Sequence, residues 1–252
     1  MSAPTLPPDS THTPASGDYS YLQHRIPVEA LPNLGDKWLF VGIDLAPIDS
    51  LETGIAVIDR NRRLMRMDKL STDADVLRML ESLGPRSGLI ICLDLPKSLS
   101  LESKWRQQEI KMHPLRLNTV HREETVDRIA PRAWALYAEM VRRGYLVLNY
   151  FTPHAKLRYH MLVPYKSRTP QGCKALQAAI RQQMSIQDLP VNLAPSSVLD
   201  AMIGAYLAWS LFKGKDGEHF ELYRNDQDQR FVDPLAVIQP KRRKPRRRRM
   251  EA

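Results

Sequence analysis

The sequence has few of the features that mark secreted, zinc-binding or membrane proteins. It has only two cysteines, Cys92 and Cys173, which lie far apart and form no CxxC pair, so we expect neither a disulfide framework nor a zinc site. The seven histidines show no HExxH spacing. We find no basic start followed by an apolar run, and no stretch approaches the roughly 18 apolar residues of a membrane span. These absences predict a cytoplasmic protein.

Positive charge is concentrated at one end of the sequence. Residues 241–249 carry eight positive charges, so of the net charge of +9 only 9 − 8 = +1 remains for the rest of the chain. Because like charges repel, we expect 241–252 to be a disordered basic tail. Such a tail binds nucleic-acid phosphates through charge alone, and a merely solubilising tail is the alternative. Residues 1–35 are rich in Pro, Ser and Thr, which predicts a disordered N-terminal arm.

The apolar pattern of 36–240 predicts one α/β domain with a mixed five-stranded sheet flanked by helices. The strand 38–44 is expected at its centre with the strand 89–94 beside it, and the polar segment 97–130 is expected to be a helical insert. Further strands are predicted at 54–59, 64–70 and 145–151, and helices at 74–83, 131–144, 153–163, 171–184 and 198–212. Residues 220–238 are expected to form a small terminal hairpin or an irregular flap.

Three aspartates stand out against their apolar surroundings. Asp44 and Asp94 each end a strand that is otherwise apolar, and Asp200 is the one charged residue between Ser196 and Phe212. Sites in open α/β sheets form at the carboxyl ends of strands, so the three carboxylates are expected to converge. Carboxylates that close repel one another unless a cation lies between them, and ligation by oxygen alone favours Mg²⁺ or Mn²⁺.

Each aspartate also has a structural explanation. Asp44 can simply begin a turn in Asp-Leu-Ala-Pro. Ser197 and Asp200 have the spacing of a capping box, in which Ser197 would cap the helix and Asp200 would return the hydrogen bond. Asp49 and Glu52, which follow Asp44, are candidates for a fourth metal ligand or are solvated loop acids.

The segments 41–44 (Val-Gly-Ile-Asp) and 53–58 resemble the first hairpin of ribonuclease H-like nucleases and Holliday-junction resolvases. The segments 91–96 and 199–205, with Phe151-Thr152-Pro153-His154-Ala155 between them, resemble a narrower, uncharacterised family of predicted nucleases in that superfamily. The resemblance spans about 38–240. It implies a ribonuclease H-like fold, nuclease activity, and metal-binding, catalytic roles for Asp44, Asp94 and Asp200.

The chain departs from these groups at two positions, which keeps a second function open. Asn149, Tyr150 and Phe151 stand where family members often place a glutamate, and Ser197 stands where resolvases have a further acid. The sequence therefore predicts a metal-dependent nuclease, with a non-catalytic nucleic-acid-binding protein as the alternative. An actin-like phosphotransferase is less favoured, because the chain has no Gly-Gly pair and no GxxxxGK[ST] motif.

Three further residues are candidates for contact with nucleic acid. Trp105, in the predicted insert, is placed to stack on a base, although a buried tryptophan of a solvated helix explains it equally well. Lys166 and Arg168 are expected near the acids, either binding phosphate or standing as ordinary surface charges. DNA and RNA are both compatible with this pattern as partners.

Overall fold

The computed structural model describes residues 24–26, 31, 36–46, 52–94, 123–161, 163, 165–166, 168–213, 221–224 and 230–233. Its strands are β1 (His24–Ile26), β2 (Leu39–Asp44), β3 (Thr53–Asp59), β4 (Leu64–Leu70), β5 (Leu89–Asp94), β6 (Leu146–Tyr150), β7 (Glu221–Arg224) and β8 (Arg230–Asp233). Its helices are α1 (Asp73–Ser82), α3 (Glu123–Arg142), α4 (Thr152–Arg158), α5 (Pro170–Met184) and α6 (Ser196–Lys213), with a short 3₁₀ turn at Arg86–Gly88.

Five strands form the sheet predicted from the sequence. Their order is β4-β3-β2-β5-β6; β2 pairs antiparallel with β3 and β3 with β4, whereas β2 pairs parallel with β5 and β5 with β6. The strand that ends at Asp44 is therefore central, with the strand that ends at Asp94 beside it, as predicted. This order and these directions are those of the ribonuclease H-like fold, so the predicted fold is confirmed.

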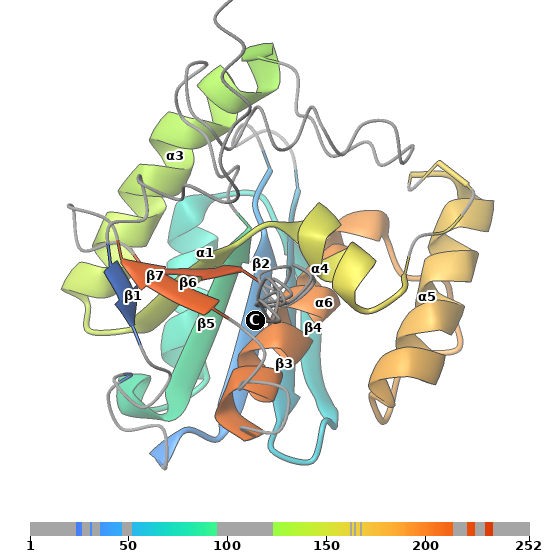
Figure 1. Ribbon diagram of the computed structural model, residues 1–252, viewed down its shortest axis with the longest axis horizontal. Coiled ribbons are helices and arrows are strands. Elements are labelled where there is room, and N and C mark those ends of the chain that lie inside the picture. Colours follow the sequence, from blue (N-terminus) through green and yellow to red (C-terminus); the bar gives the residue numbers. More distant parts are fainter. Residues whose placement is uncertain are drawn as a thin grey trace, which may run out of the picture.

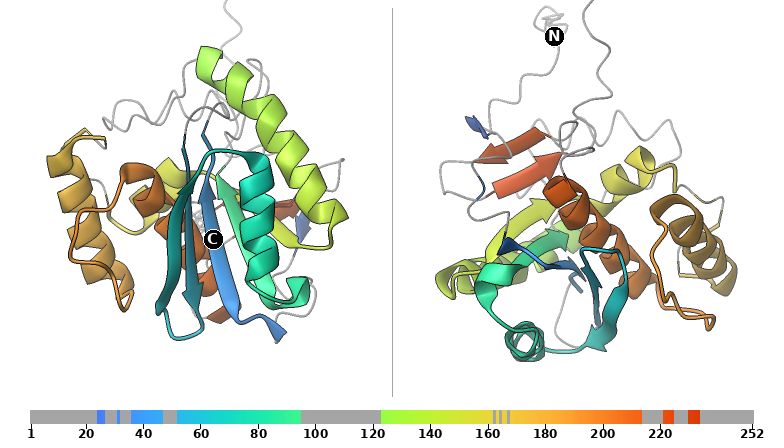
Figure 2. Two further views of the ribbon diagram at one scale, coloured as in Figure 1. Left: turned by 180° about the vertical axis from the view of Figure 1, so that it is seen from behind. Right: turned by 90° about the horizontal axis from the view of Figure 1, so that it is seen from below.

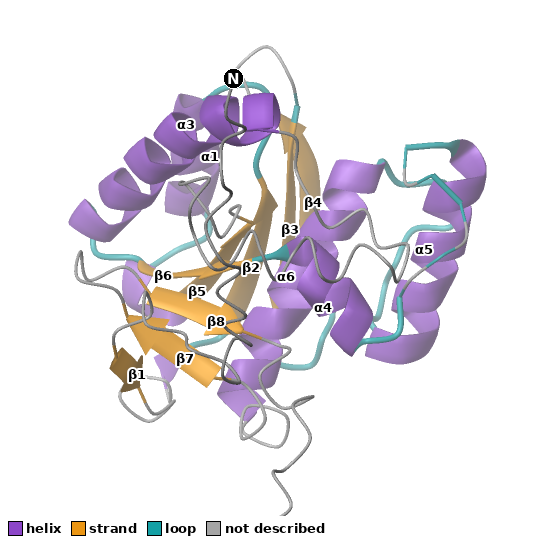
Figure 3. Cartoon of the chain, turned by 45° about the horizontal axis from the view of Figure 1, so that its top comes forward, coloured by secondary structure: helices purple, strands orange, loops and turns teal. Residues whose placement is uncertain are grey.

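Three more strands extend the sheet beyond β6. β8 lies parallel to β6, β7 is antiparallel to β8, and β1 is antiparallel to β7 (Figure 3). β7 and β8 match the hairpin predicted within 220–238. The expectation for 1–35 needs correction at His24–Ile26, because their backbone pairs with β7, and at Leu31, which is buried. The rest of that segment lies outside the described residues.

Helices cover both faces of the five-stranded sheet (Figures 1 and 2). α1 and α3 cover one face and bury Val76, Leu80, Leu136 and Met140 against the strands. α4, α5 and α6 form the other layer, in which α6 packs directly on the sheet. β2 and β5 are therefore buried on both faces, which explains why their sequences are apolar up to the last residue.

The helix predicted to start at Pro131 begins earlier. α3 runs from Glu123, so Pro131 lies inside it and not at its first position, which corrects that expectation. A proline inside a helix removes one backbone hydrogen bond. The residues after it anchor the helix nonetheless, because Ala133, Leu136 and Met140 are buried against the sheet. The end of the predicted insert, from 123 to 130, thus belongs to α3, and the rest of 97–130 lies outside the described residues.

Candidate metal centre

Asp44 and Asp94 lie side by side at the carboxyl end of the sheet. In the parallel pairing of β2 with β5, Asp44 is the register partner of Asp94, and Asp94 is in turn the partner of Tyr150 on β6. Side chains alternate along a strand, and Phe40 and Cys92 point towards the α6 layer. Asp44 lies four positions after Phe40 and Asp94 lies two positions after Cys92, so their carboxylates face the same layer.

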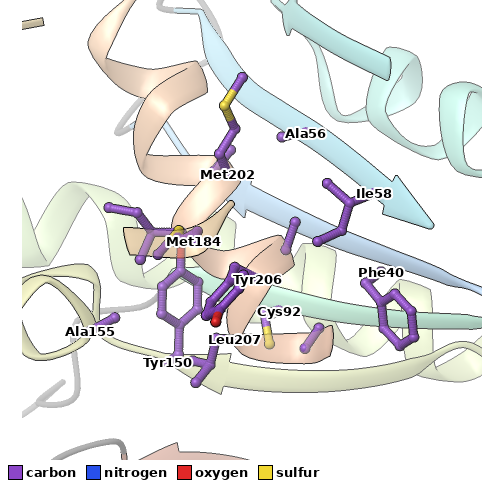
Figure 4. Packing of buried hydrophobic residues seen from close by; sticks show 14 of the residues in the cluster. Phe40, Ala56, Ile58, Cys92, Tyr150, Ala155, Met184, Met202, Tyr206 and Leu207 are labelled. Atoms are coloured by element: carbon purple, nitrogen blue, oxygen red, sulfur yellow. The ribbon is translucent and has the colours of Figure 1, made fainter. Parts of the chain in front are cut away.

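Two glycines bring α6, and with it Asp200, onto the same edge. A Cβ at Gly42 would overlap the backbone of Ala201 and Ala205, and a Cβ at Gly54 would overlap the backbone of Ser197. The helix backbone therefore rests directly on β2 and β3, a close approach that only glycine permits. Figure 4 shows buried side chains between these strands and α6, with Ala56 of β3 near Met202 of α6. Because Asp200 immediately precedes Ala201, it lies over the end of β2.

The structure does not contain the capping box considered for Asp200. α6 begins at Ser196, so Ser197 is already inside the helix and does not cap it. The side chain of Asp200 instead contacts Lys156 of α4, with 2.6 Å between Nζ and Oδ1, and each of the two side chains is only 16% exposed. The sequence alternative fails because a helix capped by Ser197 would begin at Val198, whereas α6 begins two residues earlier.

Burial and mutual repulsion shift the acids towards their neutral forms. Burial, followed by the charges of Asp200 and Asp94, raises the pKa of Asp44 well above its ordinary value. Burial also raises the pKa of Asp94 to about 6, although a hydrogen bond from Thr152 opposes the shift. The pKa of Asp200 is raised by burial against the opposing charge of Lys156. Carboxylates held this way favour a cation, because ionising all of them without one is costly.

The junction between β6 and α4 holds two of the acids in place. The backbone N–H of Thr152 donates to Oδ1 of Asp94 at 3.0 Å, and the hydroxyl of Tyr150 donates to the backbone carbonyl of Asp200 at 3.2 Å. The hydroxyl of Thr152 donates to that of Tyr150 at 3.2 Å. Burial and the charges of Asp94 and Asp44 raise the pKa of Tyr150 well above its usual range, so this hydroxyl stays protonated and remains a donor.

Of the other residues predicted to belong to the site, Arg168 acts electrostatically on the acids, whereas Glu52 pairs elsewhere. Arg168 is exposed, and its charge opposes the upward shift in the pKa of both Asp44 and Asp200, which puts it within electrostatic reach of the acids. Lys166 lies in the exposed turn before α5, where its carbonyl accepts a hydrogen bond from the N–H of Thr169. Glu52 points away to pair with Lys69 of β4. Trp105 and Asp49 lie outside the described residues.

The donors fit a hard divalent cation by their chemistry. They are carboxylate oxygens, the ligands that Mg²⁺ and Mn²⁺ prefer, and when ionised they carry three negative charges, which the charges of Lys156 and the exposed Arg168 only partly offset. Within the ranges that the structure describes, however, no group of three or more His, Cys, Asp or Glu side chains is placed closely enough to hold a metal ion. The three acids thus influence one another electrostatically without forming a completed metal cage.

Sequence reasoning missed Lys156 and Tyr150. Both could have been found from their positions in the sequence. Tyr150 is the last residue of β6, and Lys156 lies one turn into α4, the helix that follows this strand. The carboxyl end of β6 belongs to the same sheet edge as those of β2 and β5, so its polar residues were candidates on the same grounds as the aspartates.

The fold defined by this sheet and site is that of the ribonuclease H-like proteins. Among solved structures, the chain is similar to RuvC of T. thermophilus in complex with a Holliday-junction substrate, with a TM-score of 0.43, 14% sequence identity, and coverage of 71% of this chain and 96% of that chain. No protein-family model matches the sequence, and a search of curated proteins finds no match. The fold assignment rests on the strand order and directions.

None of the helices in the described part of the chain combines the length and hydrophobicity of a membrane span.

Proposed function

We propose that this protein is a divalent-metal-dependent nuclease that hydrolyses nucleic-acid phosphodiester bonds. The observation that supports the proposal is the electrostatic coupling of Asp44, Asp94 and Asp200 near one sheet edge, where burial raises the pKa of all three. Carboxylates in such a setting are stabilised by a cation, and perturbed titratable groups gather at functional sites.

Asp44, Asp94 and Asp200 would hold Mg²⁺ or Mn²⁺. A bound divalent ion lowers the pKa of water and stabilises the charge that develops during phosphodiester hydrolysis. The chain's own part is to position the acids: the N–H of Thr152 orients Asp94, and the hydroxyl of Tyr150 holds the backbone at Asp200. Arg168, which is exposed near the acids, and Lys166 are proposed to contact the phosphate backbone, together with Trp105 and the basic segment 241–249.

Labelled DNA and RNA test this proposal as single strands, duplexes and four-way junctions, each with Mg²⁺, Mn²⁺ or a chelator. We expect cleavage of at least one form that requires the metal. Asp44→Asn should reduce that cleavage by at least about 100-fold. Loss of a residue that only supports a metal ligand already costs up to about 100-fold in activity, and Asp44 is proposed to be a ligand itself. Asp68→Asn is the matched control, because Asp68 is a β4 acid that pairs with Arg66 away from the site.

One observation favours a second function, a nucleic-acid-binding protein without catalysis. The acids do not form a completed cage in the described residues, and Ser197 stands where resolvases have a further acid. The same experiment separates the two functions. Salt-sensitive binding without cleavage of any form, with Asp44→Asn behaving as the wild type, would establish the second function and reject the first.

A further inference from the structure

Lys156 is the cation that contacts the three-acid cluster most directly. Its ammonium lies 2.6 Å from Oδ1 of Asp200, and both side chains are largely shielded from solvent. Its positive charge also favours ionisation of Asp44 and Asp94. This lysine thus compensates the whole cluster and is not confined to one acid.

The position of Lys156 follows from the junction that fixes Asp94. Thr152 donates its N–H to Asp94 at the start of α4, and Lys156 follows one turn later. α4 packs against α6, which carries Asp200 (Figure 3). One helix therefore contacts one acid through its first N–H group and a second acid through its lysine.

The Lys156–Asp200 contact is held by charge more than by alignment. Oδ1 of Asp200 is buried and has no hydrogen-bond partner of good geometry, although the ammonium of Lys156 is close to it. An ammonium is a compact charge on a flexible stem of four carbons, so it can leave one carboxylate for another anion without backbone movement. A divalent cation that replaces the ammonium brings two positive charges where Lys156 brings one, so it compensates ionised carboxylates more completely.

We propose that Lys156 is an internal cation that exchanges with the divalent metal: it occupies Oδ1 of Asp200, and metal binding moves it off that oxygen. While Lys156 holds this oxygen, Asp200 cannot offer it to a metal. This exchange rests on the proposed metal site, and it makes Lys156 a positioning residue that sets the metal affinity.

Mn²⁺ titration of the full chain without nucleic acid, followed by the electron paramagnetic resonance signal of free Mn²⁺, tests the exchange. Lys156→Met removes the charge and keeps the length, so it should bind Mn²⁺ at least roughly tenfold more tightly than the wild type. Lys156→Arg keeps the charge and should stay close to the wild type, and Asp200→Asn should bind more weakly. If Lys156→Met is unfolded without metal but folds when Mn²⁺ is added, that result also supports the exchange. If Lys156→Met stays unfolded with Mn²⁺, the exchange is overturned.

Acetylation of the wild type, read at each lysine by mass spectrometry, gives an independent measurement. Mg²⁺ should speed the labelling of Lys156 and leave that of Lys69 unchanged, because Lys69 pairs with Glu52 outside the acid cluster. If the wild type binds Mn²⁺ but Lys156→Met binds no more tightly, or Lys156 labelling ignores Mg²⁺, the exchange is wrong and the metal site stands. If neither protein binds Mn²⁺, the proposed metal site fails together with the exchange.

Discussion

At the scale of single residues, ionisation of the three buried acids lowers the stability of the metal-free fold. A carboxyl whose pKa is raised by folding binds its proton more tightly in the folded than in the unfolded protein. The stability associated with that proton is therefore fully present below the unfolded pKa of about 3.9 and is lost as the pH rises through the folded value. For Asp94, whose folded pKa is about 6, this loss falls between about pH 4 and pH 7.

Asp94→Asn should consequently stabilise the metal-free protein in a pH-dependent way. The asparagine keeps an oxygen to accept the N–H of Thr152 but carries no charge. A shift from 3.8 to about 6 corresponds to about 3 kcal/mol, as an upper bound, at pH 8 and to almost nothing at pH 4. Thermal or urea unfolding with a chelator at both pH values measures the difference.

The metal should reverse this ranking. With Mn²⁺ at pH 8, the wild type should gain stability by binding the ion, and Asp94→Asn should gain much less. An Asp94→Asn variant that is less stable than the wild type at pH 8 without metal would show that the buried carboxylate stabilises the fold, contrary to the upward shift of its pKa.

At the scale of elements, the site depends on how closely α6 approaches the sheet. Gly42 and Gly54 let the helix backbone rest on β2 and β3, and this contact sets the distance from Asp200 to Asp44. Gly42→Ala should push α6 away, because its Cβ would overlap backbone atoms of Ala201 and Ala205, which cannot rotate aside as a side chain can. Overpacking of this kind costs about 1–3 kcal/mol and sometimes more.

Gly42→Ala should therefore lower both the stability and the Mn²⁺ affinity. Gly144→Ala is the matched control: Gly144 has a φ of +85°, so alanine is strained there, but its Cβ would meet nothing within 4 Å. Both variants should melt earlier than the wild type, and only Gly42→Ala should bind Mn²⁺ less tightly. Equal Mn²⁺ affinities in the two variants would show that the close approach of α6 to the sheet does not control metal binding.

The sequence predicted the part of the site that depends on strands and not the part that depends on packing. Asp44 and Asp94 end buried parallel strands, and register at a sheet edge follows from that pattern. The ion pair of Asp200 depends on where α4 packs against α6, which no local pattern encodes. β1 was missed because its three residues have no periodicity of their own, and β7 supplies their pairing.

At the scale of the whole molecule, charge is divided unequally between the domain and its tail. The segment 241–249, which lies outside the described residues, carries eight of the nine net positive charges. The acid cluster carries charge of the opposite sign, which repels phosphate until it is compensated. Under the proposed function, we therefore expect attraction of a nucleic acid to depend mainly on the basic segment and hydrolysis to depend on the domain.

Deletion of 241–252 should weaken nucleic-acid binding and flatten its dependence on salt. Each phosphate contact contributes about 0.9 to the slope of log affinity against log salt concentration for duplex DNA, so eight cations account for at most about 7. Fluorescence anisotropy at several salt concentrations measures the slope for the full chain, the deletion, and a full-length variant with glutamine at the eight basic positions.

The glutamine variant should match the deletion, because the effect comes from charge and not from length. Cleavage at saturating substrate should persist in both variants, since Asp44, Asp94 and Asp200 are untouched. Unchanged affinity at low salt in both variants would show that the domain, and not the tail, supplies the attraction.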